Sequence, residues 1–168
     1  MLSRGASLGP ASLFVILVLV IVDQVTKWLV VRAIPLHGNV EVIPGLLSIT
    51  HVRNTGAAFG LLNAVDFPYK ATVVVLLAVV ALVAIALYGG RFVSDSAIGR
   101  GGFTLVLGGA IGNLIDRASQ GYVVDFVDVY WRGYHFWAFN VADSAITIGV
   151  SLMLVDMLEL GSHASKTV

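Results

Sequence analysis

The sequence predicts an α-helical membrane protein with four transmembrane helices and a small antiparallel β-sheet outside the bilayer. Three observations favour this fold class. The 168 residues are 58% hydrophobic and only 12% charged, whereas soluble domains are about 45–50% apolar and about 25% charged. Four apolar segments approach the roughly 20 residues that a helix needs to cross a bilayer. Two intervening stretches instead combine turn signals, strand-like alternation or clustered aromatic residues.

The composition excludes several classes of function. Ten Lys and Arg residues balance ten Asp and Glu residues, so no basic excess exists to neutralise a nucleic-acid backbone, and we expect no nucleic-acid partner. With no cysteine, the chain can form no disulfide, thiolate nucleophile or cysteine-ligated metal site. The four histidines lack metal-ligand spacing. We expect one domain over residues 1–168, with neither a metal nor another cofactor.

The first predicted span covers about residues 11–32. It opens with the uninterrupted apolar run ASLFVILVLVIV, as expected for a helix that enters a bilayer. A secretory signal peptide is the alternative, but the run leads into Asp23, Lys27 and Trp28 instead of an A-x-A cleavage site. We therefore expect a retained helix.

Residues 33–69 are expected outside the bilayer. Turn signals stand at Gly38-Asn39 and Pro44-Gly45, and alternating strand-type residues fill Val40–Ile43 and Leu47–Val52. Two such runs separated by a Pro-Gly turn favour a small antiparallel sheet.

The next two predicted spans are residues 70–90 and 97–116. The first has no charge after Lys70, whereas the second is rich in glycine. Within the second span, the spacing of Gly108 and Gly112 forms a face of small residues that lets helix backbones approach closely in lipid. We interpret these glycines as packing positions of a helix bundle.

Residues 117–137 are expected outside the bilayer again, and residues 138–159 form the fourth span. Seven of the sixteen aromatic residues lie between Phe126 and Phe139, a clustering typical of the membrane–water interface. The fourth span has Asp143 near its start. Four spans put both extramembrane stretches, and the span ends beside them, on one side of the bilayer.

Ionisable and amide side chains gather near that side. Because such groups are costly in a bilayer, each indicates a functional site by default, and several share one helix face at a spacing of three or four residues. Alternatives remain: ion pairs or anchors at the membrane surface, hydrogen bonds between helices, and for Asp143 a cap on the fourth helix. The residues concerned are Asp23, Lys27, Asn113, Asp116, Arg117, Asp125, Asp128, Asn140 and Asp143.

Paired carboxylates are the simplest chemistry that this set could perform. The chain has no Ser-His-Asp pattern, H-E-x-x-H motif or phosphate-binding glycine loop. Two close carboxylates cannot both ionise readily, so one can act as a base on water while the other, protonated, polarises a carbonyl. The spacing leaves open which two pair among Asp23, Asp116, Asp125, Asp128 and Asp143, with Lys27, Arg53 and Arg117 as the expected counter-charges.

Five short sequence blocks identify the family of the chain more specifically than its composition does. The blocks are DQVTK at Asp23–Lys27, RNTGAAFG at Arg53–Gly60, GGAIGNLIDR at Gly108–Arg117, VVDF at Val123–Phe126 and FNVADSAI at Phe139–Ile146. In this order, and with four spans at this chain length, they resemble the lipoprotein signal peptidases (signal peptidase II).

The resemblance implies an aspartic endopeptidase of the bacterial inner membrane that uses no cofactor. It would remove the signal peptides of prolipoproteins by cutting just before the diacylglyceryl-modified cysteine. The family fold implies an extracytoplasmic β-cradle within Leu36–Gly60 and a short interfacial helix in the aromatic stretch after Asp125. Membrane lipid and lipid-modified signal peptides are the expected partners, and a monomer is the expected working unit.

Compared position by position, the resemblance implies two catalytic residues, Asp125 and Asp143, which are the aspartates of VVDF and FNVADSAI. No metal ligand is expected. The pocket that binds substrate or supports the aspartates is expected to comprise Asp23, Lys27, Asn54, Gly56, Asn113, Asp116, Arg117, Asn140 and Ala142.

The expected orientation comes from the resemblance. The distribution of Lys and Arg alone would put the elaborate face in the cytoplasm. The family topology instead puts both termini in the cytoplasm and the active site near the extracytoplasmic face. Two other classes of function stand beside the peptidase: a small proton-coupled transporter or channel subunit, and a non-catalytic assembly factor that clamps lipidated peptides.

Overall fold

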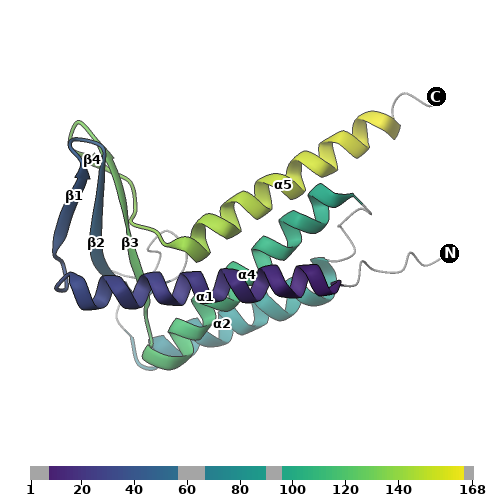
Figure 1. Ribbon diagram of the computed structural model, residues 1–168. Helices are drawn as coiled ribbons and strands as arrows, with labels where there is room; N and C mark the ends of the chain where they lie inside the picture. Colours follow the sequence, from purple (N-terminus) through teal and green to yellow (C-terminus); the bar gives the residue numbers. More distant parts are fainter. Residues whose placement is uncertain (1–7, 57–66, 90–95, 165–168) are drawn as a thin grey trace.

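The computed structural model describes residues 8–56, 67–89 and 96–164 of the chain. Within these residues, four long helices pack together and a four-stranded antiparallel sheet lies at one end of them (Figure 1). Each of the four helices is long and apolar enough to cross a membrane. The first helix begins and the last helix ends at the opposite end from the sheet, as an even number of spans requires.

The elements follow the chain in the order helix, hairpin, two helices, hairpin, helix. The helices are α1 (Pro10–Ala33), α2 (Lys70–Ala84), which continues into the π-helical turn η2 (Ile85–Gly89), α4 (Ala97–Gln120) and α5 (Val141–Ala164). The strands are β1 (Asn39–Ile43), β2 (Leu47–Asn54), β3 (Val123–Trp131) and β4 (Tyr134–His135). The helices overlap the four expected spans, but α4 and α5 continue past their expected ends at residues 116 and 159, and α5 begins three residues after its expected start.

Local sequence explains where α1 and α4 begin and end. Pro10 is the first residue of α1, a position where its missing N–H is not needed. The hydroxyl of Ser96 caps α4 by accepting the N–H of Gly99. Gly121 ends α4 in the left-handed conformation, at φ 78°. The chain then continues directly into the strand β3.

Glycines allow α4 to approach both α1 and α5 closely. A Cβ on Gly108 would lie 2.6 Å from a leucine methyl carbon of α1, and one on Gly112 would lie 2.7 Å from Oδ2 of Asp23. A Cβ on Gly102 would lie 2.6 Å from the carbonyl oxygen of Gly149 on α5. The predicted small-residue face therefore packs on α1, and a second one packs on α5.

The bundle has polar groups inside and apolar groups outside. On α1 the buried side chains are Asp23, Lys27 and Val30, whereas Leu13 and Phe14 are exposed. Outward-facing apolar side chains suit a helix that lies in lipid, where ionisable groups face the interior of the bundle.

The sheet has the strand order β1-β2-β3-β4, and each neighbouring pair is antiparallel. The register between β2 and β3 shifts after Ile49, which marks a bulge. Val124 and Phe126 of β3 pack with Val30 of α1. This contact joins the sheet to the helices.

One expectation is wrong: the aromatic stretch after Asp125 forms no interfacial helix. Residues 121–140 are all described, and they contain β3 and β4. The run Val123–Trp131 is rich in valine and aromatic residues, whose side chains favour a pleated strand. The sheet is therefore larger than the one expected within Leu36–Gly60, of which Ala57–Gly60 lies outside the described residues.

Candidate active site

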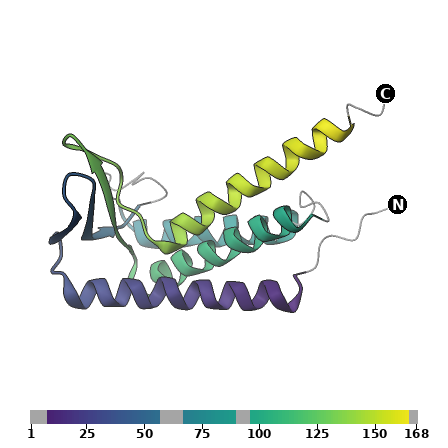
Figure 2. The same cartoon turned by 45° about the horizontal axis from the view of Figure 1, so that its top comes forward.

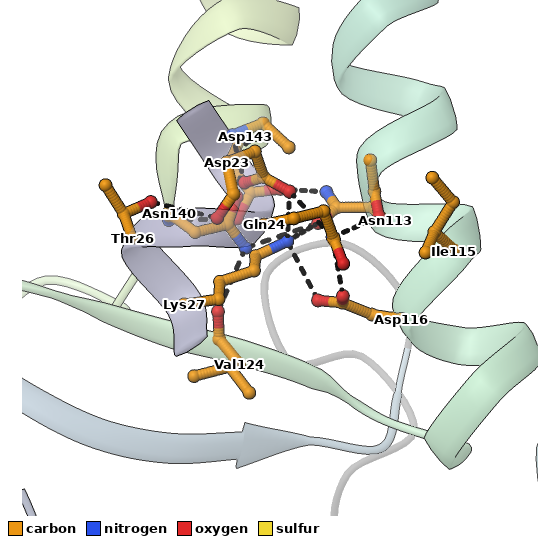
Figure 3. Close-up of polar contacts among 12 residues, drawn as sticks. Asp23, Gln24, Thr26, Lys27, Asn113, Ile115, Asp116, Val124, Asn140 and Asp143 are labelled. Atoms are coloured by element: carbon orange, nitrogen blue, oxygen red, sulfur yellow. Dashed lines mark hydrogen bonds and ion pairs between the residues drawn. The ribbon is translucent and has the colours of Figure 1, made fainter. Parts of the chain in front are cut away.

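A buried ion cluster joins α1 to α4. Lys27 Nζ lies 2.7 Å from Oδ2 of Asp23, one turn earlier on α1, and 2.8 Å from Oδ2 of Asp116 on α4. All three side chains are almost completely buried, and Figure 3 shows the group between the two helices. Because a buried charge is costly unless it is paired, both carboxylates depend on the same ammonium.

Asn113 connects this cluster to α5. Its Oδ1 accepts a hydrogen bond from Lys27 Nζ at 3.1 Å, and its Nδ2 donates to Oδ1 of Asp143 at 2.7 Å. An amide oxygen bound by an ammonium leaves the amide nitrogen for Asp143. The position of the lysine therefore orients the group that Asp143 binds.

Asp143 lies in the first turn of α5, where it forms a reciprocal cap with Asn140. Oδ1 of Asn140 accepts the backbone N–H of Asp143 at 2.9 Å, and Oδ2 of Asp143 accepts the backbone N–H of Asn140 at 3.4 Å. This is the pattern of a capping box. The capping role that the sequence left open for Asp143 is therefore present, and it coexists with the bond to Asn113.

Asn140 also binds Asp125, on β3. Its Nδ2 donates to Oδ1 of Asp125 at 2.7 Å, and Nδ2 of Asn54 on β2 donates to Oδ2 at 3.0 Å. Burial, and then the adjacent charge of Asp143, raise the pKa of Asp125 to about 6. One fully buried amide side chain thus bridges Asp125 and Asp143.

Arg117 joins the end of β2 to the same site. Its guanidinium donates to the carbonyl oxygen of Gly56 at 3.1 Å and to that of Asn113 at 3.3 Å. Oδ1 of Asn54 accepts the N–H of Gly56 at 3.0 Å, which closes a turn after β2. The positive charge of Arg117 also attracts the carboxylates of the site.

Ala142 contributes its backbone and its small size. Its N–H donates to Oδ1 of Asp23 at 3.0 Å, so that α1 fixes the start of α5. Its side chain is fully buried, and a Cβ on Gly109 of α4 would strike its carbonyl oxygen. The contacts described above connect the nine expected pocket residues to Asp125 or Asp143, some of them directly and others, such as Asp116 and Ala142, through a neighbouring residue.

Comparison with known proteins decides the family. Residues 15–159 match the family model described as Peptidase_A8: Signal peptidase (SPase) II. The chain belongs to the signal peptidase II family.

Relatives of this signal peptidase II chain support the assignment. The chain is 47% identical over 144 residues to the lipoprotein signal peptidase of Geobacter sulfurreducens, over 86% of this chain and 89% of that protein. It is 44% identical over 147 residues to that of Symbiobacterium thermophilum, over 88% and 93%. A solved bacterial membrane enzyme, determined by the in meso method, matches with a TM-score of 0.78 and 36% identity over 91% of this chain and 90% of that one.

Membership of this family identifies the chain as a bacterial membrane peptidase. Its four helices that are long and apolar enough to span a membrane agree with this. A peptidase also accounts for two carboxylates, those of Asp125 and Asp143, that are held together by contacts with Asn140. The family therefore favours an enzyme over the transporter and the non-catalytic clamp that the sequence left open.

One residue of the signal peptidase II site did not emerge from the sequence. Gln24 Nε2 donates to Oδ1 of Asp116 at 2.8 Å, and it lies 3.3 Å from both Oδ2 of Asp23 and the carbonyl oxygen of Gly112. An uncharged residue directly after Asp23 shares no helix face with it, so spacing gave no reason to select it. Its place inside the DQVTK block was the available signal.

Two residues expected among the acidic site and its counter-charges lie elsewhere. Asp128 accepts hydrogen bonds from Ser48 Oγ at 3.2 Å and from His135 Nδ1 at 2.9 Å, within the sheet. Arg53 is exposed and lies over the ring of Tyr122, 4.6 Å from its centre. Within residues 8–56, 67–89 and 96–164, no group of three or more His, Asp or Glu side chains could hold a metal ion.

Proposed function

We propose that this chain removes the signal peptides of diacylglyceryl-modified prolipoproteins by cutting the bond just before the lipidated cysteine. The observation that supports the chemistry is the pair formed by the buried Asp125 and the partly buried Asp143, joined through the amide of Asn140. The relatives named lipoprotein signal peptidase support the substrate class. Two carboxylates that share a proton can hydrolyse an amide bond by activating water.

In the proposed reaction Asp125 is the general acid and Asp143 is the general base. Burial and the adjacent Asp143 raise the pKa of Asp125 to about 6, so Asp125 is suited to hold the proton that the pair shares. The Asp143 carboxylate then faces the water. The amides of Asn113 and Asn140 fix both carboxylates in position.

The proposed steps conserve atoms and charge. Asp143 removes a proton from water as the water oxygen attacks the carbonyl carbon, and Asp125 gives its proton to the carbonyl oxygen. In the resulting diol, Asp143 returns its proton to the cysteine nitrogen while the carbon–nitrogen bond breaks. Asp125 recovers a proton from one hydroxyl as the carbonyl forms again, and both aspartates regain their starting states.

The position of the site supports its proposed orientation in the membrane. The sheet, the end of α1 and the start of α5 meet at one end of the bundle (Figure 2). A signal peptide that has crossed the membrane would present its cleavage site at that surface, while the diacylglyceryl chains stay in the bilayer. We therefore propose an active site near the extracytoplasmic face of the inner membrane, with both termini in the cytoplasm.

A single chain contains every residue that the mechanism uses. They come from α1, α4, α5 and the strands β2 and β3 of one molecule. We therefore propose a monomer whose partners are membrane lipid and the lipidated signal peptide. Binding of the lipid chains in the bilayer would orient the peptide and lower the entropic cost of attack.

Mass spectrometry of a lipidated test peptide incubated with the purified protein tests the proposal. We expect two products separated at the bond before the modified cysteine, and none from Asp125→Asn or Asp143→Asn. Asp128→Asn is the matched control, because Asp128 is a buried acid of the same strand with partners outside the site. Normal turnover by either catalytic variant would contradict the mechanism, and cleavage of the unlipidated peptide at an equal rate would contradict the substrate class.

A further inference from the structure

The hairpin formed by β3 and β4 presents large aromatic side chains to its surroundings. Trp131 is 63% exposed, Tyr134 83%, Phe136 67% and Trp137 69%. These residues lie within seven positions of the chain, and the active site does not use them. Concentrated aromatic exposure of this kind marks an interaction surface.

The hairpin is a defined structure and not an irregular loop. Arg132 and Gly133 both have left-handed backbones, at φ 51° and 82°, as a two-residue type I′ turn requires. The rings of Tyr130 and His135 stack with their centres 4.8 Å apart behind this turn. The N–H of Phe136 donates to the carbonyl oxygen of Val129 at 2.9 Å and so extends the pairing. The exposed aromatic side chains therefore belong to, or directly follow, a hydrogen-bonded hairpin.

The end of α1 contains the same chemical pair as the tip of the hairpin. The guanidinium of Arg32 lies 4.3 Å from the ring centre of Trp28, and that of Arg132 lies 4.7 Å from the ring centre of Trp131. Trp28 is 52% exposed in the last turns of a helix able to span a membrane. A tryptophan with an arginine beside it, at the end of such a helix, is typical of the headgroup region.

The β3–β4 turn, which contains Arg132, and the C-terminal end of α1 lie at a similar level of the molecule. In Figures 1 and 2 the turn between β3 and β4 lies level with the C-terminal end of α1, as seen along the direction of α1. The hairpin extends sideways from there, away from α1 and beyond the start of α5. The C-terminal end of α1 extends past the neighbouring ends of α2, α4 and α5. If the headgroup region lies at that end of α1, as Trp28 and Arg32 indicate, an element that projects sideways at the same level meets lipid headgroups.

We propose that the β3–β4 hairpin is a lipid anchor that lies in the headgroup region of the bilayer. Trp131 and Tyr134 insert at the interface, and Arg132 binds lipid phosphate. The hairpin is continuous with the part of β3 that contains Asp125, so the anchor sets the depth of Asp125 relative to the lipid surface. The proposal does not depend on the proposed cleavage reaction, because it concerns only where the hairpin lies.

Tryptophan fluorescence in vesicles tests the depth of the hairpin. The chain has three tryptophans, so Trp28→Phe with Trp137→Phe leaves Trp131 as the reporter. The reference is Trp131→Phe with Trp137→Phe, which leaves Trp28 on α1. Each variant is reconstituted in phosphatidylcholine that is brominated near the headgroup or near the methyl end of its chains, and is also titrated with iodide.

We expect shallow bromines to quench Trp131 within about twofold of their effect on Trp28, and iodide to quench both residues weakly. Efficient iodide quenching of Trp131 without bromine quenching would put the hairpin in water and overturn the proposal. Protection from both quenchers would also overturn it, because a second protein surface would then cover the hairpin.

A second arm tests the arginine. In vesicles that contain phosphatidylglycerol, Arg132→Glu should increase iodide quenching of Trp131 by at least about twofold, because a carboxylate is repelled by anionic headgroups. Arg132→Lys is the matched variant, since it keeps the charge at the same turn position, and its quenching should stay unchanged. Equal quenching in the Glu and Lys variants would contradict phosphate binding by Arg132.

Discussion

Lys27 of α1 donates a hydrogen bond of 3.1 Å to Oδ1 of Asn113 on α4, although the same ammonium already lies between two carboxylates. The bond determines which way the Asn113 amide points, and its nitrogen donates to Asp143 at 2.7 Å. The buried ammonium of Lys27 on α1 thus acts on Asp143 of α5 through the side-chain amide of Asn113 on α4. We propose that Lys27 is a positioning residue with a structural duty toward Asp23 and Asp116.

Replacing Lys27 by methionine should therefore lower both stability and activity. The change leaves the carboxylates of Asp23 and Asp116 buried without their counter-charge, and removing one partner of a buried ion pair typically costs about 3–5 kcal/mol. Thermal unfolding of the purified protein in detergent measures the loss of stability. The lipopeptide assay measures the loss of cleavage below the unfolding temperature.

Arg53→Met is the matched control for this change. It removes one cation from β2, where Arg53 is exposed and lies over Tyr122. An exposed cation–π contact is worth about 0.5–1 kcal/mol, so the unfolding temperature should change little. Similar losses in the two variants would mean that the burial of Lys27 has no special importance.

The two roles of Asn140 can be separated by Asn140→Ser. A serine hydroxyl can still accept the N–H of Asp143 as an N-cap, but it is too short to donate to Asp125. We expect the cap to remain, and the free energy of unfolding to fall by about 1–3 kcal/mol, because a buried oxygen of Asp125 loses its hydrogen bond. We expect kcat to fall by about 10²-fold or more, the usual worth of a positioned acid–base group.

Asn140→Ala completes this comparison, because alanine removes the cap as well. The alanine variant should lose about 1 kcal/mol more stability than the serine variant, with a similar loss of kcat. Parental kcat in Asn140→Ser would show that the bond to Asp125 is dispensable.

The fold was predictable wherever a single segment decides the structure. A run of about twenty mostly apolar residues favours a membrane-spanning helix, so the positions of α1, α2, α4 and α5 follow from local composition. The stretch after Asp125 was harder, because clustered aromatic residues suit both an interfacial helix and a strand. Pairing of β3 with β2, some 70 residues away in the sequence, settles the matter, and no local pattern encodes that pairing.

The candidate site was predictable as a set of residues but not as a division of roles. Residues spaced by three or four on a helix identify a shared face, but they do not say that Asp23 and Asp116 share Lys27. Alternation along β3 would have separated Asp125 from Asp128, because residues three apart on a strand point to opposite faces. That argument needed the strand to be recognised first.

Activity should depend on the protonation of Asp125. Burial and the charge of Asp143 raise its pKa to about 6, and the proposed mechanism needs the protonated form. We therefore expect kcat/KM to decrease as the pH rises through about 6, because this ratio reports the free enzyme. Rates measured on a lipopeptide across the neutral and acidic range test this, and a ratio that is flat across pH 6 would contradict the assignment of Asp125 as the acid.

The stability of the fold should also depend on the protonation of Asp125, and the direction of this pH dependence can be predicted. The pKa of Asp125 is about 6 in the folded protein and 3.8 as its ordinary value, so the folded state binds more protons between these values. The free energy of unfolding should therefore decrease as the pH rises from about 4 to about 6, and then level off. Asp125→Asn cannot titrate and should remove this part of the slope. An unchanged slope in that variant would assign the effect to another group.

Gly112→Ala should disrupt the site at the contact between α4 and α1. A Cβ there would lie 2.7 Å from Oδ2 of Asp23, the oxygen that binds Lys27. Since α1 and α4 are already in close contact, the added methyl group must displace Asp23 or separate the helices, and overpacking of this kind typically costs about 1–3 kcal/mol. Gly101→Ala lies on the same helix with nothing within 4 Å of its new Cβ, and it should stabilise α4 by up to about 1 kcal/mol. Thermal unfolding and lipopeptide cleavage are measured for both variants. They distinguish a steric effect at Asp23 from a general preference for glycine in α4. Equal behaviour of the two variants would refute the steric argument.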